Sequence, residues 1–193
     1  MGKLVFFIIG VLALATWRFA TYHPTSVHYH ANFAVYVNGQ RESFAADSYY
    51  EGVSNCYADE ANAPTERAHL HDHVNDIVHV EDSAVTWGQF FQNLGWGTGS
   101  NYIQTSDKLL VASASHPITY MLNGKPVDNP AGLVIRSLDK LLVSYGMTSK
   151  AKLQTQTQSI SDSAGVANTT PDPESCSGSA QATWKNRLEH TFQ

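Results

Sequence analysis

Residues 26–44 read SVHYHANFAVYVNGQRESF, and this stretch carries the clearest strand signal of the chain. Every second side chain from residue 29 to residue 37 is apolar or aromatic: Tyr29, Ala31, Phe33, Val35 and Val37. A period of two predicts a β-strand that turns this set into the core. The strand ends at Asn38-Gly39, a dipeptide typical of a two-residue hairpin. His28 and His30 therefore share the opposite face of the strand.

Outward from this strand, the chain alternates short strand patterns with one helix. Four further stretches predict strands: residues 77–82, 107–113, 117–127 and 132–146, the third of which repeats the Asn-Gly turn. Residues 83–97, SAVTWGQFFQNLGWG, predict a helix. It begins at Thr86 as N-cap, turns Phe90, Phe91 and Leu94 inward, and ends at Gly95 and Gly97. These elements predict an α+β fold, with an N-terminal helix followed by one β-rich domain that has a mixed sheet and at least one packed helix.

The N-terminus has the pattern of an export signal, because Lys3 precedes an apolar run from Leu4 to Trp17. We expect residues 4–20 to form one helix that stays as a single-pass membrane anchor, with the domain outside the cytoplasm. The alternative is a cleaved signal peptide and a secreted protein, for which Ala13-Leu14-Ala15 provides the small-x-small site. The predicted segments are residues 1–22 as signal anchor or signal peptide, 23–147 as the α+β domain, and 148–193 as a C-terminal extension.

The C-terminal extension is rich in Ser, Thr and Gln, but two sets of residues in it keep a helical spacing: Leu153, Thr157, Ile160 and Ala164, and then Trp184, Leu188 and Phe192. This spacing predicts packed helices, with disorder as the alternative. Cys56 and Cys176 stand in polar, turn-rich segments, without a C-x-x-C motif or an adjacent histidine. In an oxidising compartment they predict a disulfide bond that ties the extension to the 45–67 loop.

Composition excludes several classes of function. The chain has 12 Lys and Arg residues, a formal net charge of −5 and no basic run, so a nucleic-acid-binding surface is not expected. No nucleophile elbow, P-loop or dinucleotide-binding fingerprint is present. Only three methionines occur, and one of them is Met1, which argues against a thioether copper(I) site.

The histidines are the remaining sequence feature that indicates a function. Six of the nine lie between residues 28 and 79, and the stretch 69–82 reads HLHDHVNDIVHVED. They form three H-x-H or H-x-E units, namely His28/His30, His69/His71/His73 and His79/Glu81. Residues two apart in a strand point to one face, so each unit offers two or three ligands side by side.

The connection between residues 73 and 77 determines how these units meet. A three-residue loop at Val74-Asn75-Asp76 predicts that His71 faces His79, that His69 faces Glu81, and that His73 faces Ile77. This register turns Leu70, Val78 and Val80 together into the core. A two-residue turn at Asn75-Asp76 would instead shift the register by one and set His79 and Glu81 against His69 and His71.

The pattern predicts a transition-metal site for Zn²⁺ or Cu²⁺. Its candidate ligands are His28, His30, His69, His71, His73, His79 and Glu81, with Asp72 or Asp76 as an acceptor for an imidazole N–H. The other three histidines, His23, His116 and His190, lack the H-x-H or H-x-E spacing. We expect them to have surface or packing roles. We expect metal capture, buffering or delivery. The alternatives are a metalloenzyme of hydrolase or lyase type, in which Glu81 acts as general base on metal-bound water, and a structural envelope protein that the metal stabilises. Whether the protein is an enzyme stays open, and no catalytic residue is assigned.

The layout of these motifs resembles that of a group of small membrane-anchored bacterial proteins. The shared order is H-x-H, N-G, H-x-H-D, H-V-E and a helix with F-F. Here these elements are His28/His30, Asn38-Gly39, His69/His71/Asp72, His79/Glu81 and Phe90/Phe91. The resemblance covers residues 28 to 146 and implies a shared metal site but no particular activity. The chain departs from that layout at His73 and by one additional residue in the turn.

Overall fold

The structure is a computed structural model that describes residues 2–22, 27–50, 67–71, 73–170 and 184–192. The chain divides into two compact units. One contains Met1–Ser26 and Ser177–Gln193, and the other is Val27–Cys176. Cys56 and Cys176 both lie outside the described residues, so their disulfide bond stays a prediction.

The smaller unit contains two helices. Helix α1 is Gly2–Thr21, which confirms the predicted single helix over residues 4–20, and α6 is Trp184–Phe192. The two helices contact each other. Among the residues that the structure describes, no helix has both the length and the apolar character required to cross a membrane.

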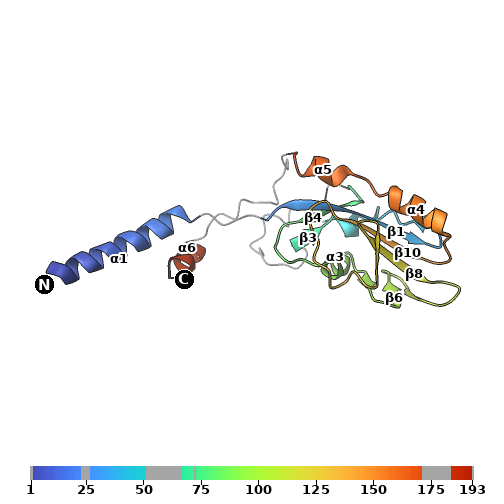
Figure 1. Ribbon diagram of the computed structural model, residues 1–193, viewed down its shortest axis with the longest axis horizontal. Coiled ribbons are helices and arrows are strands. Elements are labelled where there is room, and N and C mark those ends of the chain that lie inside the picture. Colours follow the sequence, from blue (N-terminus) through green and yellow to red (C-terminus); the bar gives the residue numbers. More distant parts are fainter. Residues whose placement is uncertain (1, 23–26, 51–66, 72, 171–183, 193) are drawn as a thin grey trace. The chain divides into compact units, whose positions relative to one another are not determined.

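The larger unit is built on a mixed sheet, as predicted from the sequence (Figure 1). Its path is β3-β4-β1-β10-β8-β9, and β2 also pairs with β1. The bounds are β1 Tyr29–Val37, β2 Gln40–Arg41, β3 Ala68–His69, β4 Ile77–Val80, β8 Ile118–Leu122, β9 Lys125–Val127 and β10 Lys140–Tyr145. Strands β1 and β10 are parallel, and the other neighbours are antiparallel.

Both predicted Asn-Gly hairpins are confirmed. Asn38 and Gly39 have φ of 51° and 82°, and Asn123 and Gly124 have φ of 53° and 75°. Two successive positive φ values define the tight turn that matches the twist of paired strands. The last predicted strand begins later than expected, at Lys140, because Leu138 has a φ of 66° and breaks the extended chain before it.

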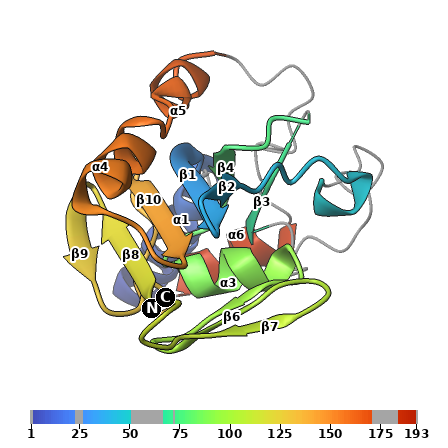
Figure 2. The same ribbon diagram turned by 90° about the vertical axis from the view of Figure 1, so that its right-hand side faces the viewer.

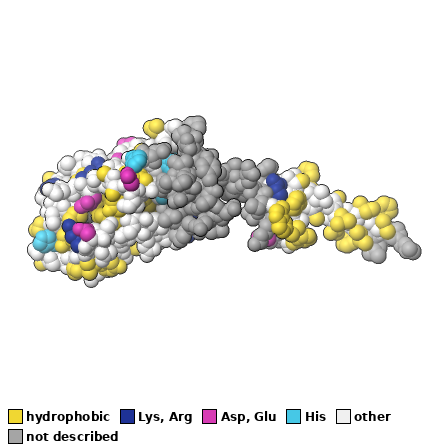
Figure 3. All heavy atoms as spheres, turned by 180° about the vertical axis from the view of Figure 1, so that it is seen from behind, with side chains coloured by type: hydrophobic (Ala, Val, Ile, Leu, Met, Phe, Trp, Pro, Cys, Tyr) yellow, Lys and Arg dark blue, Asp and Glu magenta, His cyan; other side chains and the backbone are white. Residues whose placement is uncertain are grey.

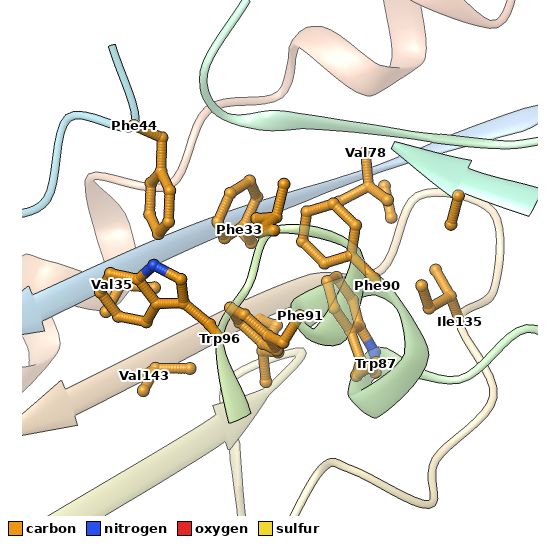
Figure 4. Packing of buried hydrophobic residues seen from close by; sticks show 14 of the residues in the cluster. Phe33, Val35, Phe44, Val78, Trp87, Phe90, Phe91, Trp96, Ile135 and Val143 are labelled. Atoms are coloured by element: carbon orange, nitrogen blue, oxygen red, sulfur yellow. The ribbon is translucent and has the colours of Figure 1, made fainter. Parts of the chain in front are cut away.

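One face of the sheet carries the apolar core, which α3 (Trp87–Asn93) covers (Figure 4). The predicted N-cap is confirmed, since the Thr86 hydroxyl accepts from the backbone N–H of Gln89 and the Gln89 side-chain oxygen accepts from the backbone N–H of Thr86. Trp87, Phe90 and Phe91 are fully buried against the odd-numbered residues of β1. Gly95, with a φ of 72°, ends the helix as predicted.

The other face of the sheet is covered by residues that follow the last strand. Helices α4 (Lys150–Gln158) and α5 (Ser163–Ala167) lie on the opposite side of the sheet from α3 (Figure 2). Ile160 between them packs with Ala34 of β1 and Leu142 of β10. The predicted packing of Leu153, Thr157, Ile160 and Ala164 is thus confirmed, since each of them is buried or half-buried. The predicted packing of the second set is wrong, because Trp184, Leu188 and Phe192 of α6 are exposed. The remaining described elements are the 3₁₀ turn η1 (Asp47–Tyr49) and a small antiparallel sheet of β5 (Gly97–Thr98), β6 (Tyr102–Gln104) and β7 (Leu109–Val111).

Candidate metal centre

His79 occupies the middle of a row of histidines that crosses three strands. It lies on β4, between β1 and β3 in the sheet. His30 of β1 is its direct partner on one side, and His69 of β3 is its direct partner on the other. Side chains of paired residues project from the same face of a sheet. All three imidazoles therefore lie on the face opposite the apolar core.

Three histidines bring their ring nitrogens close enough to share one ion. His28, His30 and His79 each offer a nitrogen, and these nitrogens all lie within 4.8 Å of one another. The Nε2 atoms of His30 and His79 are 2.7 Å apart. The His30 ring meets the rings of His28 and His79 almost perpendicularly, at 74° and 87°. An imidazole lone pair lies in the ring plane, so these edge contacts turn nitrogens toward a common point.

Asn168, just beyond α5, determines the protonation of His30. Its Oδ1 atom accepts from the backbone N–H of His30 at 2.8 Å, which establishes which end of the amide faces the histidine. The Nδ1 atom of His30 lies 2.8 Å from the same oxygen. An amide oxygen only accepts, so Nδ1 of His30 carries the proton and donates it. The Nε2 atom of His30 is then the acceptor in the 2.7 Å hydrogen bond with Nε2 of His79.

Burial keeps His79 neutral. His30 is 2% exposed, and His28 and His79 are half-buried. Burial, followed by the electrostatic effect of the neighbouring imidazoles of His30, His69, His28 and His71, lowers the pKa of His79 from 6.5 to about 2. The Nε2 atom of His28 and the Nδ1 atom of His79 are buried and meet no hydrogen-bond partner in the described part of the chain. Neutral imidazole is the form that binds metal ions.

His69 and His71 flank the three-histidine group with a different geometry. Both are buried, and their rings lie 5.6 and 5.2 Å from the ring of His79. Here the planes are nearly parallel, at 20° and 29°. Stacked rings hold their lone pairs in separate, parallel planes. His69 and His71 thus contact the face of His79, whereas His30 meets its nitrogen edge.

The predicted pairing of His71 with His79 is wrong, because His69 holds that position. Strand β3 ends at His69, and Leu70 forms a bridge with Tyr50 instead of continuing the ladder. The backbone N–H of Val74 then donates to the carbonyl of His71, so His71 belongs to the turn. The error is two residues, which is a full period of the strand. His69, His71 and His79 therefore stay on one face as predicted, with Leu70, Val78 and Val80 in the core.

The remaining predicted ligands lie outside the three-histidine group. His73 is exposed, with its ring on Tyr50 at 4.7 Å and its Nδ1 atom 4.0 Å from a carboxylate oxygen of Asp47. Its φ of 56° turns it out of the strand direction. Glu81 follows β4, where its backbone N–H donates to Arg67, and its Oε1 atom is buried.

The other singled-out polar residues have different partners. Asp76 pairs with Arg41 at 3.4 Å, and Asp72 lies outside the described residues. His116 is exposed and stacks on Tyr145, while His190 belongs to α6. His23 also lies outside the described part of the chain.

Asn168 is the functional residue that the sequence patterns missed. It stands 138 positions from His30 and shares no motif with any histidine. The available signal is its place four residues after Ala164, which is one helical turn further along the predicted spacing, although Asn168 itself is exposed. That spacing indicates contact with the sheet but not with a particular residue.

Comparisons of the chain with protein-family models, with curated proteins and with solved structures find no match. Function is therefore inferred from the chemistry of the site.

Proposed function

We propose that this protein binds one transition-metal ion, Zn²⁺ or Cu²⁺, through His28, His30 and His79, and that it serves to capture, buffer or deliver that ion outside the cytoplasm. The observation that carries the proposal is the convergence of three imidazole nitrogens within 4.8 Å of one another. Imidazole is a preferred ligand of both ions, and two ligands from one strand with a third from its neighbour is a common way to build such a site.

The hydrogen bond from His30 to Asn168 supports this proposal. Metal-binding histidines usually donate their second ring N–H to an oxygen acceptor, which orients the ring and raises its basicity. The Oδ1 atom of Asn168 supplies that acceptor at 2.8 Å. It also leaves Nε2, the atom that faces His79, as the ligand atom.

Capture or delivery is favoured over a structural role by where the core lies. The main apolar cluster contains Phe33, Phe90 and Phe91 and occupies the opposite face of the sheet from the histidines. A domain with such a core does not depend on a metal ion to fold, unlike the small domains that metals hold together. The half-buried His28 and His79 leave the ion a route to the site.

The predicted enzyme mechanism needs Glu81 as a general base beside the ion. Among the described residues, the group of potential ligands that converges contains three histidines and no carboxylate. Glu81, the predicted general base, lies outside that group. A binding role therefore agrees better with the arrangement than hydrolysis does.

The test is metal analysis of protein that is purified without a His-tag. Equilibrium dialysis against Zn²⁺ and, separately, Cu²⁺ should give one tightly bound equivalent. His79→Ala and His30→Ala should each lose it, while His116→Ala, which changes an exposed histidine outside the site, should retain it. A full equivalent in His79→Ala at neutral pH would contradict the proposal. Circular dichroism of each variant separates loss of the site from loss of the fold.

A further inference from the structure

The two helices of the smaller unit pack with their polar residues inward. On α6, Thr191 is buried and Arg187 and His190 are half-buried. The apolar residues of the same helix point away, with Trp184 71%, Leu188 44% and Phe192 77% exposed. These three residues are four apart and form one stripe on the helix. In water an amphipathic helix packs the other way round, with its apolar stripe on its neighbour.

Reciprocal arginine bonds hold this arrangement. Arg187 of α6 donates to the carbonyls of Phe19 and Ala20, at 2.9 and 3.3 Å, near the C-terminal end of α1. Arg18 of α1 donates to the carbonyl of His190 near the end of α6, at 2.9 Å. Carbonyls in the last turn of a helix have no partner within the helix. An arginine of each helix thus donates to the C-terminal carbonyls of the other helix. Both guanidinium groups lie at the contact between the helices.

Helix α1 is apolar on its outer surface as well. Nine large apolar side chains between Val5 and Trp17 are 48–77% exposed. Figure 3 shows yellow apolar atoms along this helix. Ala15, Arg18 and Phe19 are less exposed than their neighbours, and they lie at the end of the helix that α6 contacts. The apolar stripe of α6 therefore adds to an apolar surface that surrounds α1.

We propose that α1 and α6 together bind a lipid bilayer, and that α6 lies along the membrane interface with Trp184, Leu188 and Phe192 in the acyl chains. Polar contacts inside and apolar side chains outside are the arrangement that a hydrocarbon solvent stabilises. The exposed Trp17 and Trp184 supply the indole rings that concentrate at membrane interfaces. A protein partner would cover one stripe, whereas the apolar surface of α1 extends around the helix. The histidine site would then belong to a membrane-bound protein.

The test uses the full-length chain and fluorescence quenching by brominated phosphatidylcholine vesicles. Trp87 and Trp96 are buried in the core of the larger unit, so Trp17→Phe protein reports on Trp184. We expect brominated vesicles to quench its emission strongly and to protect it from acrylamide. The double variant Trp17→Phe/Trp184→Phe should show neither effect, which assigns the signal.

A matched pair of variants tests the stripe. In the Trp17→Phe background, Leu188→Ser/Phe192→Ser should weaken the quenching several-fold. Leu109→Ser/Val111→Ser, which changes two equally exposed apolar residues of β7, should leave it unchanged. Far-UV circular dichroism of each variant, compared with the Trp17→Phe protein, shows that its helices still form. Trp184 that stays accessible to acrylamide with vesicles present would overturn the proposal. So would vesicle-independent dimers that protect it, because the stripe would then be occupied by a second copy of the chain.

Discussion

At the scale of single residues, the site depends on a proton position that Asn168 determines. Its amide oxygen accepts both the backbone N–H and the Nδ1–H of His30. Asn168 is itself held by Ser137, whose Oγ atom accepts from its amide nitrogen at 3.0 Å. The nitrogen of His30 that the proposed metal site would use is thus set by a residue outside the three-histidine group.

Asn168→Ala should lower metal affinity about 10- to 100-fold without changing the stoichiometry, which is the usual effect of removing such an acceptor. The reason is that His30 would lose the bond that orients its ring and selects its tautomer. Competition titration against a chromophoric chelator measures the change. Thr169→Ala, at the exposed next position, is the control. Equal affinity in the wild type and in Asn168→Ala would contradict the assigned role.

Histidine burial also makes the metal-free fold sensitive to acid. The pKa of His79 in the folded protein, about 2, lies below its unfolded value of 6.5, so the unfolded chain binds this proton more tightly. The stability that neutral His79 contributes is therefore fully present above pH 6.5. It is lost progressively as the pH falls toward the pKa of His79 in the folded protein. The slope that one such group contributes is at most about 1.4 kcal/mol per pH unit.

Urea unfolding in the presence of a chelator, between pH 7.5 and pH 5, measures this loss. The free energy of unfolding should decrease toward pH 5 in the wild type. His79→Gln, which removes the titrating group but keeps a polar side chain, should decrease less steeply. A profile that is flat over this range in the wild type would show that His79 does not stay neutral in the folded protein.

At the scale of elements, helix α3 connects the core to the strand that carries His69. Asn93 near its C-terminus donates to the carbonyl of Ala68 in β3, at 2.8 Å. The helix has only seven residues, too few to be stable alone. It depends on its buried aromatic face and on the capping box of Thr86 and Gln89.

Thr86→Ala should lower the free energy of unfolding by about 1 kcal/mol, because the backbone N–H of Gln89 would lose its acceptor. Thr86→Ser keeps the oxygen and should recover most of the loss. Chemical denaturation of the three proteins measures the difference. An equal loss in Thr86→Ser and Thr86→Ala would assign the effect to the methyl group of Thr86 instead of its cap.

At the scale of the whole molecule, the segment after β10 is part of the domain and covers the histidine face. The larger unit reaches from Val27 to Cys176 and includes α4 and α5. The backbone N–H of Ala164 donates to Asn32 of β1, and Gln156 accepts from Ser144 of β10. These contacts bring the C-terminal segment back to the central strands.

The predicted disulfide bond between Cys56 and Cys176 would close the same unit. Protein recovered from an oxidising compartment should take up no maleimide before reduction and two equivalents after it, as read by intact mass. The loop-entropy model assigns about 4–5 kcal/mol to a bridge over this separation, so reduction should also lower the melting temperature. Cys56→Ser should abolish both effects. Two labelled thiols before reduction would exclude the bond.

The sequence by itself determined the local elements and the face on which the histidines lie. Three of these features depend only on residues that are neighbours in the sequence: the alternation along residues 29–37, the two Asn-Gly turns and the Thr86 cap. They can therefore be predicted without knowledge of the fold. Histidines two apart in a strand project from the same face. A shift of the register between two strands by an even number of residues does not change which face that is. This is why the prediction of one histidine face survived an error of two residues in the pairing of β3 with β4.

Only the tertiary structure decided which histidines converge. The bridge from Leu70 to Tyr50 ends the pairing of β3 with β4 at His69, and it depends on a contact that no local pattern encodes. The parallel pairing of β1 with β10 and the approach of Asn168 to His30 join residues more than a hundred positions apart. Such contacts are selected by the packing of the whole domain, because a strand pattern specifies a buried face but not the partner of each residue.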